Sequence, residues 1–198
     1  KDWLHLRMEH LAALETKDDD SVEETFWASY ITNKEIANDA IKIAVSSSDT
    51  VVIVPDEATR QEAIKKFNIR ENKERILTIF EAKGIEWKTV VLYHMLKSNE
   101  SYFLDMIEGR GIKSTIHRMC FNKYYVSCTR SLSTFVVIED GTNPTVLAKV
   151  LTELAFISEK AQVELYLSVE STYEGWVDEG RKLQDAGQLD AARNAFLN

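Results

Sequence analysis

The sequence is poor in the residues that mark several classes of protein. Only 7 of its 198 residues are Gly and 2 are Pro, which excludes collagen-like and low-complexity chains. Its 2 Cys, Cys120 and Cys128, are too few for a secreted disulfide framework and have no metal-ligand spacing around them, so we expect free thiols and no metal site. No apolar run approaches the roughly 20 residues that cross a bilayer, so we expect no membrane contact.

Charge constrains the function further. The 24 basic and 32 acidic side chains give a formal net charge of −8, which argues against binding of nucleic acid through bulk charge alone. Any such function would require a local site. Hydrophobic residues make up 44% and aromatic residues 10%, enough for a sizeable core. The chain opens at Lys1 without a Met or a charged-then-apolar leader. We therefore expect a cytoplasmic piece of a longer protein with no signal peptide.

The pattern along the chain predicts three parts. Residues 1–23 combine an amphipathic helical stretch with an acidic loop, and residues 24–157 alternate short apolar strands with helices. This alternation predicts an α/β fold with a doubly wound, mostly parallel sheet, whose ligands usually bind beyond the carboxyl ends of the strands. Residues 158–198 predict only helices, as an all-helical extension.

Turn and cap signals place the elements of the central part. Strands are expected at residues 24–30, 50–54, 76–80, 89–93 and 134–138. Helices are expected after the capping stretch 32–35, from Asp56 to about Phe67, and from about 114 to 130, the last preceded by a loop at Gly109 and Gly111. A tight polar segment, 81–87, joins the third strand to the fourth.

Three segments carry the functional signal. They are Thr78–Trp87 (TIFEAKGIEW) before an apolar strand, Tyr124–Ser131 (YYVSCTRS) before another, and Tyr30–Ile36 (YITNKEI). They resemble motifs V, VI and IV of the C-terminal RecA-like motor domain of superfamily 1 DNA helicases of the UvrD/Rep type. The resemblance covers residues 22–156 and implies a RecA-like sheet that works with ATP and single-stranded DNA.

The resemblance also implies roles for individual residues. Arg130 is the expected catalytic residue, an arginine finger, because phosphoryl transfer needs a positive charge at the γ-phosphate and a guanidinium supplies a permanent one. The expected ATP-binding residues are Glu86, Gly84 and Lys83, and the expected DNA contacts are Thr78, Phe80 and Thr129. Outside the motif context, Arg130 has the ordinary interpretation of a helix-surface arginine and Glu86 that of a solvated turn carboxylate.

The sequence departs from the family pattern in ways that affect function. Ile31 stands where motif IV carries a second γ-phosphate arginine, Phe80 where motif V has a His, and Ser131 where motif VI has an Ala. No Gly-x-x-x-x-Gly-Lys-[Ser/Thr] segment is present, so the chain lacks a P-loop and is not a complete ATPase. The resemblance therefore implies an upstream P-loop domain that holds most of the ATP and Mg, with no cofactor expected on this chain alone.

The last residues have a pattern of their own. Over residues 173–198 the spacing resembles a partial tetratricopeptide repeat, carried by Trp176, Gly180, Leu183, Gly187, Leu189, Ala192 and Phe196. It implies a helical hairpin and a protein partner, whereas the ordinary interpretation is a generic helical hairpin.

Two other hypotheses remain open. One is a degenerate helicase-fold scaffold whose helical repeats mediate protein–protein interaction, which Ile31 and the acidic balance favour. The other is an acidic receiver-like domain, which needs an acidic cluster at strand ends, whereas Asp49 and Asp56 flank only one strand.

Overall fold

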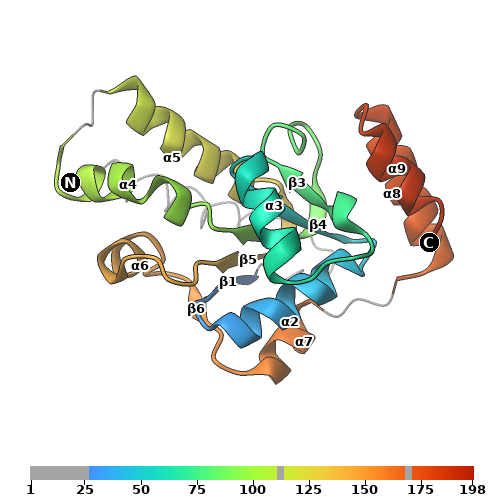
Figure 1. The fold of residues 1–198 in the computed structure, drawn as a ribbon, viewed down its shortest axis with the longest axis horizontal. Coiled ribbons are helices and arrows are strands. Elements are labelled where there is room, and N and C mark those ends of the chain that lie inside the picture. Colours follow the sequence, from blue (N-terminus) through green and yellow to red (C-terminus); the bar gives the residue numbers. More distant parts are fainter. Residues whose placement is uncertain (1–26, 111–113, 168–170) are drawn as a thin grey trace, which may run out of the picture.

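The fold is a parallel sheet covered by helices on both faces (Figure 1). The computed structural model describes residues 27–110, 114–167 and 171–198. Its strands are β1 (Trp27–Ile31), β2 (Thr50–Val54), β3 (Ile76–Thr78), β4 (Trp87–Tyr93), β5 (Ser131–Ile138) and β6 (Ala155–Phe156). They form one sheet in the order β3-β2-β4-β5-β1-β6, in which every described pairing is parallel. The predicted doubly wound α/β fold is confirmed, and the sheet is consistent with a RecA-like domain.

The helices begin largely where the cap residues predict. They are α2 (Lys34–Val45), α3 (Glu57–Lys66), α4 (Glu100–Ile107), α5 (Thr115–Cys128), α6 (Pro144–Val150), α7 (Lys160–Leu167), α8 (Tyr173–Asp185) and α9 (Leu189–Ala195). The side chains of Asn33 and Asp56 accept hydrogen bonds from the first turns of α2 and α3. Within the described ranges, no helix has both the length and the apolar character to cross a membrane.

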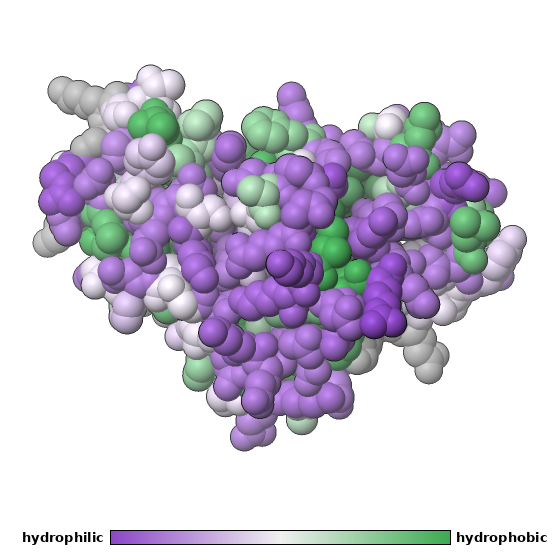
Figure 2. Space-filling model, in the orientation of Figure 1, coloured by the Kyte–Doolittle hydropathy of each residue, from purple (hydrophilic) through white to green (hydrophobic). Residues whose placement is uncertain are grey.

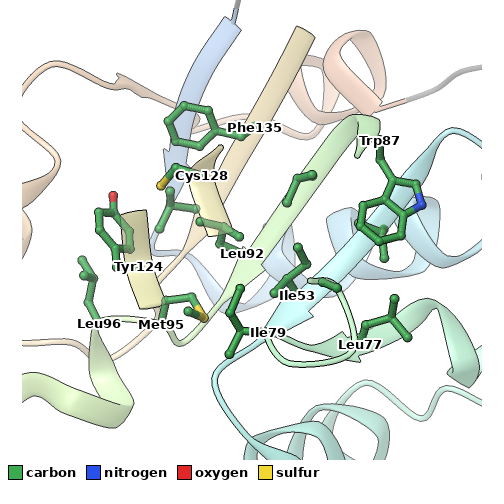
Figure 3. Close-up of a cluster of buried hydrophobic side chains, with 14 of the residues drawn as sticks. Ile53, Leu77, Ile79, Trp87, Leu92, Met95, Leu96, Tyr124, Cys128 and Phe135 are labelled. Carbon is green, nitrogen blue, oxygen red and sulfur yellow. The ribbon is translucent and has the colours of Figure 1, made fainter. Parts of the chain in front are cut away.

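Two hydrophobic clusters sandwich the sheet, and β2 contributes to both. All 5 residues of β2 are buried. Val51 and Ile53 belong to the cluster under α4, α5 and α6, whereas Val52 and Val54 belong to the one under α2, α3 and α7. Figure 3 shows the first cluster, with Ile53 and neighbouring strand residues near Tyr124 and Cys128 of α5. A continuous apolar strand is therefore explained by cover on both faces.

Some elements differ from the sequence prediction. The third strand ends at Thr78, so the prediction that it extends to residue 80 is wrong, and Phe80 is 72% exposed in the following turn. Helix α4 occupies much of the stretch that precedes the predicted loop at Gly109, because Phe103 and Met106 pack into the core. Strand β6 is only 2 residues long and exposed, too short for a hydrophobic period to identify it.

The connection from β3 to β4 crosses the sheet without a helix. The two strands are parallel and β2 lies between them, so residues 79–86 run from the carboxyl end of β3 back to the amino end of β4. The side chains of Ile79, Ala82 and Ile85 are buried in the hydrophobic cluster and hold this connection against the sheet. The segment 81–87, which the sequence predicts to be polar, therefore also contributes buried apolar side chains.

The C-terminal hairpin, α8 and α9, packs into the same cluster as the sheet through Trp176 and Leu183. Its two helices cross closely at Gly180, where an added Cβ would lie 2.5 Å from the ring of Phe196. A larger residue at position 180 would therefore force the Phe196 ring to move. The expected boundary at residue 157 stays a prediction, and the part expected at residues 1–23 lies outside the described residues.

A buried polar cluster stands at the carboxyl ends of β4 and β5. Asp140 accepts a hydrogen bond from Lys66 Nζ at 2.6 Å, and its other oxygen lies 2.7 Å from His94 Nε2. Burial opposes the ionised form of Asp140, but these contacts outweigh it and hold its pKa well below the usual range. Lys66 also donates to the Tyr93 hydroxyl at 3.1 Å, so α3 is joined to both strands.

The Asp140 contacts predict a specific loss of stability in acid. Because the pKa of Asp140 is lowered on folding, its contribution is present above the unfolded pKa of about 3.9 and is lost as pH falls below it. We expect Asp140→Asn to lower the free energy of unfolding by about 2 kcal/mol at pH 7, because hydrogen bonds to a charged group are lost. Urea unfolding at several pH values should show this difference shrinking below about pH 4. A difference that is constant with pH would contradict the assignment.

Candidate functional site

The segments that resemble motifs V and VI meet at the amino-terminal ends of β4 and β5. The backbone N–H of Trp87 donates to the carbonyl of Arg130 at 2.9 Å, so Glu86 and Arg130 lie on neighbouring chain segments. Both residues immediately precede a strand of a parallel sheet, which fixes them at the same edge. This edge is opposite to the one at which doubly wound sheets usually bind ligands.

The Arg130 side chain folds back on the end of α5. Its Nε donates to the carbonyl of Val126 at 3.2 Å, and Nη2 lies 3.4 Å from the Thr129 hydroxyl. The Thr129 hydroxyl itself donates to the same carbonyl at 2.9 Å. A guanidinium at this place is favourable because it neutralises the partial negative charge of the helix C-terminus. To contact a phosphate, the half-buried side chain would have to exchange these bonds for new ones.

Lys83, Gly84 and Glu86 are exposed on the connection that leads to β4. Gly84 has φ +83°, a left-handed conformation that side-chain-bearing residues rarely adopt, and an added Cβ would meet nothing within 4 Å. The Gly is therefore required by the turn and not by crowding. This turn exposes its backbone next to the cation of Lys83.

Thr78 lies at the other edge, where β3 ends. Its backbone N–H and its hydroxyl both donate to Glu81 Oε2 at 2.7 Å. Arg60 of α3 binds the two oxygens of Glu81 at 3.0 and 2.9 Å. The hydroxyl hydrogen of Thr78 is therefore engaged within its own turn. The sequence analysis did not identify Arg60 or Glu81. The Thr78-x-x-Glu81 spacing is a local signal for the turn contact, whereas Arg60 is 21 residues from Glu81 and no sequence signal relates the two.

Ile31 does not lie near Arg130. It is fully buried at the carboxyl end of β1, in register with Ile138 of β5. Strand β5 has 8 residues, so the two edges are about 23 Å apart. The structure therefore does not bring together the two positions at which the resemblance places phosphate-binding arginines, because β1 and β5 are parallel.

Helix α8 borders the Glu86 edge, which the sequence analysis did not foresee. Lys182 Nζ donates to the carbonyl of Glu86 at 3.2 Å and lies 5.0 Å from the centre of the Trp87 ring. Burial lowers the pKa of Lys182, although the neighbouring Glu179 opposes this effect. No sequence signal relates residues that are 96 positions apart.

Phe80 has a cationic neighbour that the motif did not indicate. The ammonium group of Lys123, on α5, lies 5.2 Å from the centre of the Phe80 ring. The ring nevertheless stays 72% exposed. Within the described ranges, no group of His, Cys, Asp and Glu side chains could hold a metal ion.

Comparisons with known proteins add a distant structural likeness. No protein-family model and no curated protein matches the sequence. Among solved structures, the chain is similar to the C-terminal domain of a possible DNA helicase from Lactobacillus plantarum WCFS1. The sequences are 14% identical and the TM-score is 0.43, over 66% of this chain and 84% of that chain. This match assigns no role to individual residues.

Proposed function

We propose that this chain is the C-terminal motor domain of an ATP-driven DNA helicase of the UvrD/Rep type. The observation that carries the proposal is the hydrogen bond between Trp87 and Arg130, which makes neighbours of two motifs 43 residues apart in sequence. It gives one edge of the sheet a carboxylate, Glu86, and a permanent cation, Arg130. These are the groups that a ribose and a breaking phosphoanhydride bond require.

In this proposal the two edges of the sheet have different tasks. At the amino-terminal edge, Arg130 stabilises charge on the γ-phosphate, Glu86 accepts from ribose hydroxyls, and Lys83 with the Gly84 backbone faces phosphate. At the carboxyl end of β3, Thr78 and Phe80 contact single-stranded DNA. Since the chain has no P-loop, the partner is an upstream P-loop domain, which would hold ATP and Mg. The connection 79–86 would then join the residues that face a nucleotide between the two domains to the residues that contact single-stranded DNA.

The test is ATP turnover by the chain joined to the P-loop domain of the same protein. We expect turnover that single-stranded DNA stimulates, and no turnover by residues 1–198 alone. Absence of turnover in the joined protein, with folding verified by circular dichroism, would overturn the proposal.

A second candidate is a scaffold in which a helicase fold no longer turns over ATP and the helical repeat recruits a protein. One observation favours it: the hairpin bears a groove of about 300 Å³ whose lining includes Leu189 and Leu197, which are 66% and 75% exposed. Exposed apolar side chains that lie together are typical of a surface that a protein partner covers. This candidate gains support if the joined protein binds ATP but does not hydrolyse it.

A further inference from the structure

The distribution of charge sets α5 apart from the rest of this acidic protein. The chain has 32 acidic residues, yet none lies between Glu108 and Glu139. Helix α5, within that interval, carries Arg118 and Lys123 and no carboxylate. On a protein of net charge −8, a helix with two cations and no carboxylate provides the local site that an anionic polymer requires.

The outer face of α5 is also partly apolar. Ile116 and Met119 are 40% and 47% exposed, and they precede Lys123 at helical spacing. In Figure 1, α5 lies along one margin of the molecule, and Figure 2 shows hydrophobic atoms there on an otherwise largely hydrophilic face. The inner face of the helix is occupied by Phe121, Tyr124 and Cys128, which are in the core. Ile116 and Met119 are therefore not explained by packing against the sheet.

Phe80 extends this face to the β3–β4 connection. Its contact with Lys123 places an exposed aromatic ring beside a cation. A π face next to a cation is the combination on which single-stranded nucleic acids bind, because bases stack on the ring and phosphates pair with the charge. The buried neighbours Ile79 and Ala82 already anchor the turn, so the Phe80 ring is not needed to hold it against the sheet.

Two carboxylates next to this surface already have partners. Glu81, next to Phe80, is bound by Arg60 through both oxygens. Asp105, beside the first turns of α5, contacts Arg110 and His117, and the hydrogen bond from Arg110 is the main cause of its lowered pKa. Repulsion of a polyanion by these groups is therefore reduced.

We propose that Phe80 and the outer face of α5 form a binding surface for single-stranded nucleic acid. A base stacks on Phe80, Arg118 and Lys123 contact phosphates, and Ile116 and Met119 contact further bases or sugars. The inference rests on the proposed function for the class of ligand, and it extends the DNA contact from Thr78 and Phe80 to a path along α5.

Fluorescence anisotropy with a labelled oligothymidine tests the path. Because stacking on one aromatic residue accounts for a large share of affinity per base, we expect Phe80→Ala to weaken binding by about 5- to 100-fold. Replacing Arg118 and Lys123 together by Gln should reduce the salt slope of log K by about 1.4, since each phosphate contact on a single strand contributes about 0.7. A duplex of the same length should respond less to Phe80→Ala, because its bases are stacked on each other.

Matched variants serve as controls. Tyr173 on α8 is 73% exposed, so Tyr173→Ala removes an aromatic residue of equal exposure. Lys34 and Lys65 are exposed on α2 and α3, so replacing both by Gln makes the same change in charge. We expect binding to be nearly unchanged in the Tyr173 variant and the salt slope to be unchanged in the lysine variant.

The outcomes separate this inference from the proposed function. If the wild-type chain binds but Phe80→Ala behaves like Tyr173→Ala, the α5 path is wrong while a helicase role stands. If the wild-type chain binds no oligothymidine even at low salt, the inference fails, and a protein becomes the occupant to consider for this face. The proposed function is decided independently by ATP turnover in the joined protein.

Discussion

Glu179→Ala is expected to lower the free energy of unfolding by about 3–5 kcal/mol, because it leaves a buried arginine without its counter-charge. Glu179 and Arg75 pair with side chains 2% and 4% exposed. Burial opposes ionisation of Glu179, but Arg75 and Lys182 together hold its pKa below the usual range. Glu179 also accepts from the Trp87 indole at 2.8 Å, so one carboxylate joins α8 to β4. Urea denaturation at pH 7 measures the loss.

The neighbouring position provides the control for this prediction. Asp178 pairs with Arg181 at 3.2 Å, with side chains 75% and 69% exposed, so Asp178→Ala should cost less than about 1 kcal/mol. Replacing Arg75 by Met and Glu179 by Leu together should cost less than Glu179→Ala, because no unpaired charge remains buried. Equal effects of Glu179→Ala and Asp178→Ala would show that the buried pair does not hold the hairpin to the sheet.

The sequence predicts the central strands well because burial on both faces leaves a simple pattern. The run Thr50–Val54 is wholly apolar apart from its first residue, and the structure has it as a strand with the predicted bounds. Strand β6 and helix α4 escape this reasoning, since one is 2 residues long and the other 8. Short elements owe their existence to tertiary contacts that local periodicity does not reveal.

The candidate site is predictable only in its individual residues. Motif spacing identifies Glu86 and Arg130, but their adjacency follows from the parallel pairing of β4 with β5, which a sequence does not show. The residues around the site are even harder to predict from the sequence, because the contacts of Lys182 with Glu86 and of Lys123 with Phe80 join elements far apart in the chain. The position of Ile31 is likewise not evident from the sequence. Because β1 and β5 are parallel, Ile31 lies beside Ile138 at one end of β5, whereas Arg130 precedes the other end.

Under the proposed function, Arg130→Ala in a protein that joins the chain to an upstream P-loop domain is expected to reduce kcat by about 10³- to 10⁵-fold, the range that arginine fingers contribute. Arg130→Lys should recover little of this loss, because an ammonium group lacks the planar fork that binds two phosphate oxygens. Steady-state ATPase assays at saturating single-stranded DNA measure both variants. Arg70 is exposed in the loop after α3, so Arg70→Ala removes a cation without touching either motif and should keep wild-type turnover.

Arg130 also has a structural role at the end of α5, distinct from the proposed role in phosphoryl transfer. Its bonds to Val126 and Thr129 close the last turn of α5, and losing them should cost about 1 kcal/mol of stability. That loss is too small to explain a thousandfold drop in kcat in a folded protein, so urea unfolding of the same variants separates the two effects. Wild-type turnover in Arg130→Ala would exclude the finger. Because Ile31 is buried at the opposite edge, no residue at that position is placed to substitute, and the loss on removing Arg130 should approach the upper end of the range.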